Sequence, residues 1–181
     1  MWRLDCTVLL FPHVESEPKA DWRGDHDLRP LRVEGFERAH TLAREIGSVD
    51  AIYSSPALRS AQTVEPLAQV LGLAVIRLEG LREAGATRHQ APWDWWLDQP
   101  MQGAIHASAV AGRMLKTLSA LASRHRGGRI AVCSHGDAVP IVVACLCTAW
   151  ELPLPEPCNY GGWYEITEAQ VHARGRLLRA G

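Results

Sequence analysis

The sequence lacks a large net charge of either sign, a long apolar run and an even number of cysteines. Its formal net charge is −1 over 181 residues, which does not predict a basic surface for nucleic acid. No apolar run is long enough to cross a bilayer, and the N-terminus does not have the pattern of a secretory signal. Five cysteines, several of them in apolar runs, are typical of buried thiols in a reducing compartment. We therefore expect a cytoplasmic protein that binds neither nucleic acid nor membrane.

The sequence also has no internal repeat and no linker-like stretch, so we expect one domain over residues 1–181. Apolar stretches typical of buried strands alternate with stretches of helical periodicity. Strands are predicted at 7–11, 50–53, 73–78 and 129–133, with closing strands near 163–166 and 171–178, and helices at 31–46, 57–71, 108–123 and 139–150. This alternation predicts an α/β fold, a three-layer α/β/α sandwich with a mostly parallel central sheet.

Histidines directly follow two of the predicted strands. His13 comes after the first strand, and His135 comes after the strand at 129–133. The strand at 50–53 leads into a helix whose first turn carries Arg59. Because the carboxyl ends of parallel strands meet at one edge of a sheet, we expect these three side chains to lie close together. One histidine after a strand is explained more simply as a residue that ends the strand. Two strands that each end in a histidine indicate a functional site.

Two imidazoles, a guanidinium and a helix N-terminus together suit a dianionic group. Arginine matches phosphate with a rigid fork of donors, and the N–H groups at a helix start favour anions. One imidazole can attack phosphorus while the other stabilises charge on the equatorial oxygens. Glu83, which follows the strand at 73–78, could protonate the leaving oxygen and later accept a proton from water.

These residues lie in segments that resemble the histidine phosphatase superfamily, also called the phosphoglycerate mutase-like fold. The matching segments are 13–16, 29–31 with Gly35, 53–63, 81–83 and 134–136, in the family's order. The most specific of them is Ser-Ser-Pro-x-x-Arg-x-x-Gln-Thr within 53–63. Ser-His-Gly at 134–136 is a weak motif alone and a strong one at this position.

The resemblance implies a role for each matched residue. His13 would be the nucleophile that becomes phosphohistidine, Arg59 and His135 would hold the phosphoryl group, and Glu83 would be the general acid and base. Ser16, Lys19 and Gly136 would contact the substrate. The substrate would be a small phosphorylated molecule, and neither a metal nor another cofactor would be needed.

One departure from the family pattern affects the chemistry. The family's opening motif is Arg-His-Gly, whereas this chain has Pro12, His13 and Val14. The absent arginine is a direct phosphoryl ligand in the family, and removing such a contact typically costs about 2–4 kcal/mol. Lys19, or an arginine from the nearby loops, could restore the charge; the loop arginines are Arg23, Arg82 and Arg88.

Pro12 also keeps other functions open. The chain could be a degenerate or repurposed member that binds a phosphorylated or carboxylated ligand, or that catalyses a reaction without phosphoryl transfer. A metal hydrolase would need ligands such as Asp25, His26 and Asp27, but these lie in a loop with turn character. The tryptophans at 93–96 either pack an irregular segment or form a wall against the substrate. The sequence leaves the oligomeric state open.

Overall fold

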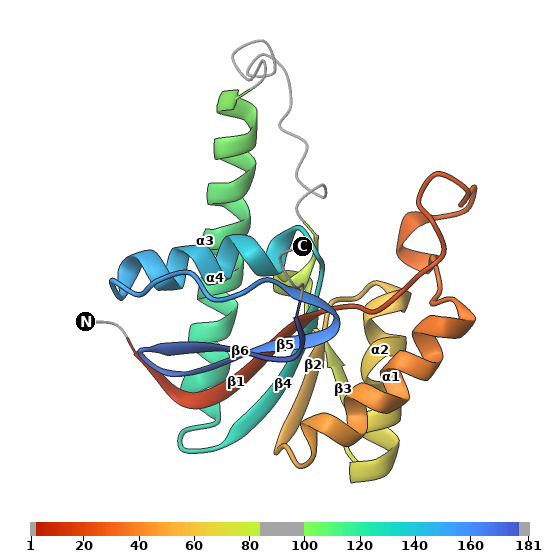
Figure 1. Cartoon of the computed structure of the whole chain (residues 1–181), viewed down its shortest axis with the longest axis horizontal. Helices are drawn as coiled ribbons and strands as arrows, with labels where there is room; N and C mark the ends of the chain where they lie inside the picture. The colour runs from red at the N-terminus through yellow and green to blue at the C-terminus, as the bar shows by residue number, and fades with distance from the viewer. Residues whose placement is uncertain (1–2, 84–99, 178–181) are drawn as a thin grey trace.

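The computed structural model describes residues 3–83 and 100–177, and its centre is a six-stranded sheet in the order β3-β2-β4-β1-β5-β6 (Figure 1). The strands are β1 (Leu4–Pro12), β2 (Ala51–Ser54), β3 (Val75–Arg77), β4 (Arg129–Ser134), β5 (Cys158–Glu168) and β6 (Gln170–Leu177). The helices are α1 (Val33–Ile46), α2 (Leu58–Leu71), α3 (Pro100–Arg124) and α4 (Ala138–Ala149), with short 3₁₀ helices η1 (His26–Leu28) and η2 (Glu79–Leu81).

The four strands β3, β2, β4 and β1 are parallel, whereas β5 pairs with β1 antiparallel and β6 pairs with β5 antiparallel. This confirms the predicted α/β fold with a mostly parallel sheet. The two closing strands begin earlier or run longer than the sequence pattern indicated. They form a hairpin at one edge of the sheet, where β6 alternates between exposed and half-buried residues.

Strand β1 is buried on both sides, which explains its continuous apolar run. Val8 and Leu10 belong to the core cluster that α3 and α4 cover. Leu9 and Phe11 belong to the cluster on the other face, which α1 and α2 cover. Successive side chains of a strand point to opposite faces, so a strand between two helical layers must be apolar at every position.

The helices begin and end close to the predicted positions, with one exception. Helix α2 ends at Leu71 and is capped by Gly72, whose φ of 66° is the left-handed conformation that glycine adopts without strain. Helix α3 begins at Pro100, well before the predicted start at 108. The tryptophans at 93–96 and Arg88 lie outside the described residues. No helix in the described part of the chain is long and apolar enough to cross a membrane.

Candidate active site

The backbone register brings the predicted site residues to one sheet edge. Pro12 pairs with Ser134 across β1 and β4, so that His13 and His135 leave the sheet side by side. The His13 N–H donates to the Ser134 carbonyl at 2.9 Å, which continues the ladder past the end of β1. Ser55 extends β2 in the same way, with its N–H donating to the Cys133 carbonyl at 2.9 Å.

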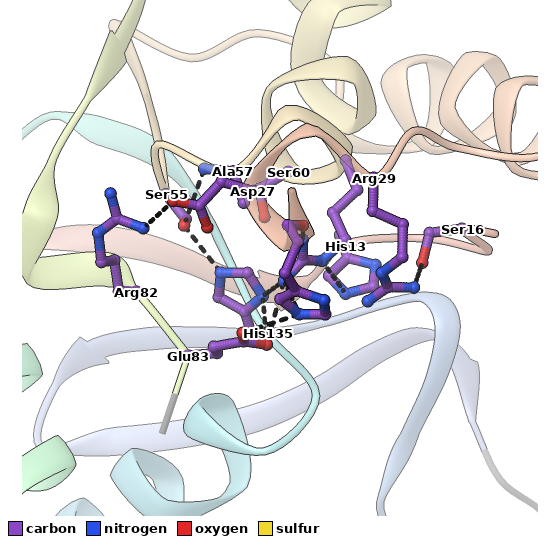
Figure 2. Close-up of polar contacts among 12 residues, drawn as sticks. His13, Ser16, Asp27, Arg29, Ser55, Ala57, Ser60, Arg82, Glu83 and His135 are labelled. Atoms are coloured by element: carbon purple, nitrogen blue, oxygen red, sulfur yellow. Dashed lines mark hydrogen bonds and ion pairs between the residues drawn. The ribbon is translucent and has the colours of Figure 1, made fainter. Parts of the chain in front are cut away.

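Arg59 lies at the centre of the site and is fully buried. Its Nε donates to His13 Nε2 at 3.2 Å, and its Nη2 donates to Glu83 Oε2 at 3.0 Å and faces His135 Nδ1 at 3.3 Å. The remaining donor group, Nη1, donates to the His26 carbonyl at 2.9 Å. The structure therefore brings all four predicted catalytic residues together around one guanidinium, and Figure 2 shows His13, Glu83 and His135 converging.

His13 is held as a neutral imidazole with one nitrogen available for attack. Its Nδ1–H donates to the Val14 carbonyl at 2.8 Å, which leaves the lone pair on Nε2. Burial lowers the pKa of His13 from 6.5 to about 4, and the positive charges of Arg59 and Arg29 act in the same direction. The imidazole is therefore deprotonated at neutral pH, as a nucleophile must be.

His135 is a second neutral imidazole. Its ring meets that of His13 edge to face, with centroids 5.4 Å apart. Because Nδ1 faces an arginine donor, the proton is on Nε2, which donates to Ser55 Oγ at 2.8 Å. Burial, followed by the neighbouring His13 and Arg59, holds the pKa of His135 far below 6.5.

The structure adds His26 to the site, whereas the sequence suggested His26 only as a metal ligand. Its Nε2 lies 2.9 Å from Glu83 Oε1 and 3.2 Å from Arg59 Nη2. One ring nitrogen cannot donate and accept at once, and the shorter contact to the carboxylate assigns the proton to Nε2. His26 reaches the site from η1, in a loop whose path no periodicity predicts. The only signal was its place in the Asp-His-Asp run.

The predicted substrate-binding residues are placed differently from one another. Ser16 Oγ accepts a hydrogen bond from Arg29 Nη1 at 2.7 Å (Figure 2). Lys19 is exposed in the loop that follows β1. Gly136 is exposed directly after His135, and a β carbon added there would meet open space.

The loop arginines proposed to replace the missing family arginine are also spread out. Arg82 is bound to Asp27 at 2.6 Å and to Glu79, so its charge is already paired. Arg23 is exposed. Pro12 is buried and lines a cavity of about 160 Å³ with Gly136 and the exposed Tyr160.

Comparison with known proteins identifies the family. The model of the histidine phosphatase superfamily (branch 1) matches residues 8–176, and the chain belongs to this superfamily. A comparison with curated proteins gives no match.

Solved structures share the fold at low identity. YhfR from Bacillus stearothermophilus is 19% identical with a TM-score of 0.72, covering 96% of this chain and 98% of that one. Phosphoserine phosphatase from Entamoeba histolytica is 18% identical with a TM-score of 0.67, covering 96% and 100%. Mycobacterial glucosyl-3-phosphoglycerate phosphatase is 18% identical with a TM-score of 0.66, covering 97% and 99%.

The site has no evident place for a metal ion within the described residues. No group of three or more His, Cys, Asp and Glu side chains there is arranged to hold one. The acceptor atoms of His13, His135 and Glu83 instead face the guanidinium of Arg59.

Proposed function

We propose that the protein is a phosphatase that hydrolyses a small phosphomonoester through a phosphohistidine on His13. The observation that carries the proposal is the neutral His13, whose unprotonated Nε2 faces the buried Arg59. An imidazole lone pair next to a fixed positive charge is the arrangement needed to attack an anionic phosphoryl group. The named phosphatase relatives support the reaction class and leave the substrate open.

The reaction would proceed in two displacements. In the first, His13 Nε2 forms a bond to phosphorus, the phosphorus–oxygen ester bond breaks, and protonated Glu83 gives its proton to the leaving alcohol. In the second, Glu83 accepts a proton from water as the water oxygen attacks phosphorus, and the bond between phosphorus and His13 Nε2 breaks. Inorganic phosphate is released, and His13 is again a neutral imidazole. His26, 2.9 Å from Glu83, can exchange a proton between this carboxyl and solvent.

Substrate binding would rearrange the contacts of Arg59. In the structure described here, its Nε donates to His13 and its Nη2 donates to Glu83. A phosphoryl group would accept from Nε and Nη2 in place of His13 and Glu83, which would free the lone pair on His13 Nε2 for attack. Ser16, Lys19 and Gly136 remain proposed contacts of the substrate. A cytoplasmic location is consistent with five cysteines that are all free thiols.

The second candidate is a binding protein or a repurposed enzyme, and Pro12 is the observation that favours it. Both functions are tested by the hydrolysis of para-nitrophenyl phosphate by the wild type, His13→Ala and Pro12→Arg. Turnover by the wild type, loss in His13→Ala and an acid-labile phosphoenzyme would support the phosphatase. An inert wild type that gains activity in Pro12→Arg would support the second candidate.

A further inference from the structure

The site needs more positive charge than the predicted residues supply. Arg59 is paired with Glu83, and both buried imidazoles are neutral, so a bound phosphoryl dianion would meet little net positive charge. An additional cation has to lie close to His13, and it must be shielded from water to act strongly. Exposed Lys19 does not meet this requirement in the conformation described here.

Arg29 does meet the requirement. It is only 8% exposed and lies next to His13 in Figure 2, with its Nη1 bonded to Ser16 Oγ at 2.7 Å and to the Glu17 carbonyl. Its positive charge is among the causes that lower the pKa values of both His13 and Arg59, which places all three groups in one electrostatic environment.

Arg29 also has an unused donor. Its Nε is buried and has no hydrogen-bond partner among the residues that the structure describes. A buried donor left unpaired destabilises the folded protein, and it does so more when the group is charged. A ligand that accepts a hydrogen bond from Nε would remove this destabilisation.

A purely structural role explains Arg29 less well. Backbone contacts already hold the loop that follows β1. The Glu17 N–H donates to the Pro30 carbonyl at 3.0 Å, and Ser16 forms an antiparallel β-bridge with Leu31. An uncharged side chain could fill the same space without burying a guanidinium. The charge is what remains to be explained.

We propose that Arg29 is a direct ligand of the phosphoryl group and replaces the arginine that the family has at the position of Pro12. Ser16 and the Glu17 carbonyl hold Nη1, while Nε donates to a phosphoryl oxygen. Arg59 and Arg29 then bind the group with two guanidinium ions. The catalytic part of this inference rests on the proposed function, whereas the binding of a tetrahedral or trigonal oxyanion does not require turnover.

The test is the binding of orthovanadate, measured by titration calorimetry on the full chain. Arg29→Met is expected to weaken binding roughly a hundredfold, since a charge-assisted donor to the anion is lost. Arg32→Met is the matched control, because Arg32 lies three residues further on, has 47% of its side chain exposed and pairs with Glu34. It is expected to bind orthovanadate as the wild type does.

A rescue experiment separates a ligand from a structural residue. Adding Pro12→Arg to Arg29→Met is expected to raise the affinity for orthovanadate at least tenfold. Adding Pro12→Arg to the wild type is expected to raise this affinity by a smaller factor. Thermal unfolding shows whether each variant is folded, and Arg29→Gln, which also removes the charge, replaces Arg29→Met if the latter is not. Equal binding by Arg29→Met and Arg32→Met would overturn the proposal, and so would a loss that Pro12→Arg leaves unchanged.

The two proposals fail in different ways. If no phosphomonoester is hydrolysed while orthovanadate binding still depends on Arg29, the proposed function is wrong and the anion site stands. If His13→Ala abolishes hydrolysis while Arg29→Met binds orthovanadate as Arg32→Met does, the phosphatase stands and the role of Arg29 is wrong.

Discussion

The two buried imidazoles predict that the folded protein loses stability as the pH falls below about 6.5. Burial lowers the pKa of His13 from 6.5 to about 4 and lowers that of His135 in the same direction. In the unfolded chain both rings titrate near their ordinary pKa. Below pH 6.5 the unfolded state therefore binds more protons than the folded state, and the free energy of unfolding falls.

The size of the effect follows from the depressed pKa of His13. A group that is neutral when folded and protonated when unfolded changes the free energy of unfolding by about 1.4 kcal/mol per pH unit. Between pH 6.5 and 4.5, His13 alone accounts for a loss of about 2–3 kcal/mol. This contribution is fully present above pH 6.5, and below pH 4 no more of it is lost.

The assay is urea unfolding, followed by circular dichroism at pH 7.5 and pH 4.5, for the wild type and His13→Gln. The wild type is expected to lose about 2–3 kcal/mol more than His13→Gln over this range, because the variant has one such imidazole fewer. His40→Gln, at an exposed position of α1, is the control and should lose as much as the wild type. Equal losses in the wild type and His13→Gln would show that His13 is not held neutral in the folded protein.

Three further outcomes are expected. Gly35→Ala would place a β carbon 2.0 Å from the Glu15 carbonyl oxygen, so the free energy of unfolding in urea should fall by about 1–3 kcal/mol. Gly112→Ala, which meets open space in α3, should instead keep or raise stability by about 0.5–1 kcal/mol. His26→Ala should lower kcat for an aryl phosphate about 10- to 100-fold with an unchanged unfolding curve, because Glu83 loses its proton-exchange partner. An unchanged kcat would show that Glu83 exchanges protons with water directly.

The sequence predicted the part of the site that regular structure places. His13 and His135 follow buried parallel strands, and the register of β1 with β4 puts them side by side, as the pattern of strand ends indicates. Arg59 is fixed by the first turn of α2, next to the end of β2. Apolar strands between helices leave few alternatives for these positions, because any other arrangement would expose the core.

The sequence did not predict the part of the site that the loop after β1 supplies. His26 and Arg29 lie in a stretch without periodicity, and their approach to Arg59 and His13 depends on long-range contacts such as the bridge between Ser16 and Leu31. The sequence pattern also did not predict that β5 and β6 are antiparallel, since an alternating pattern indicates a strand but not its direction in the sheet. The early start of α3 precedes the part of the helix with clear amphipathic periodicity.

Charge balance connects the missing arginine with the proposed chemistry. For the first displacement Glu83 has to carry a proton, which releases the charge of Arg59 from its ion pair. Arg59 and Arg29 then present two positive charges to a phosphoryl dianion, with His13 and His135 neutral between them. If Arg29 were uncharged, one negative charge would remain uncompensated in a buried site, where charges interact far more strongly than in water. A chain with Pro12 beside the proposed nucleophile can therefore keep the proposed chemistry only if a second buried cation is supplied from elsewhere. Among the described residues that contact His13 or Ser16, the cations are Arg59 and Arg29.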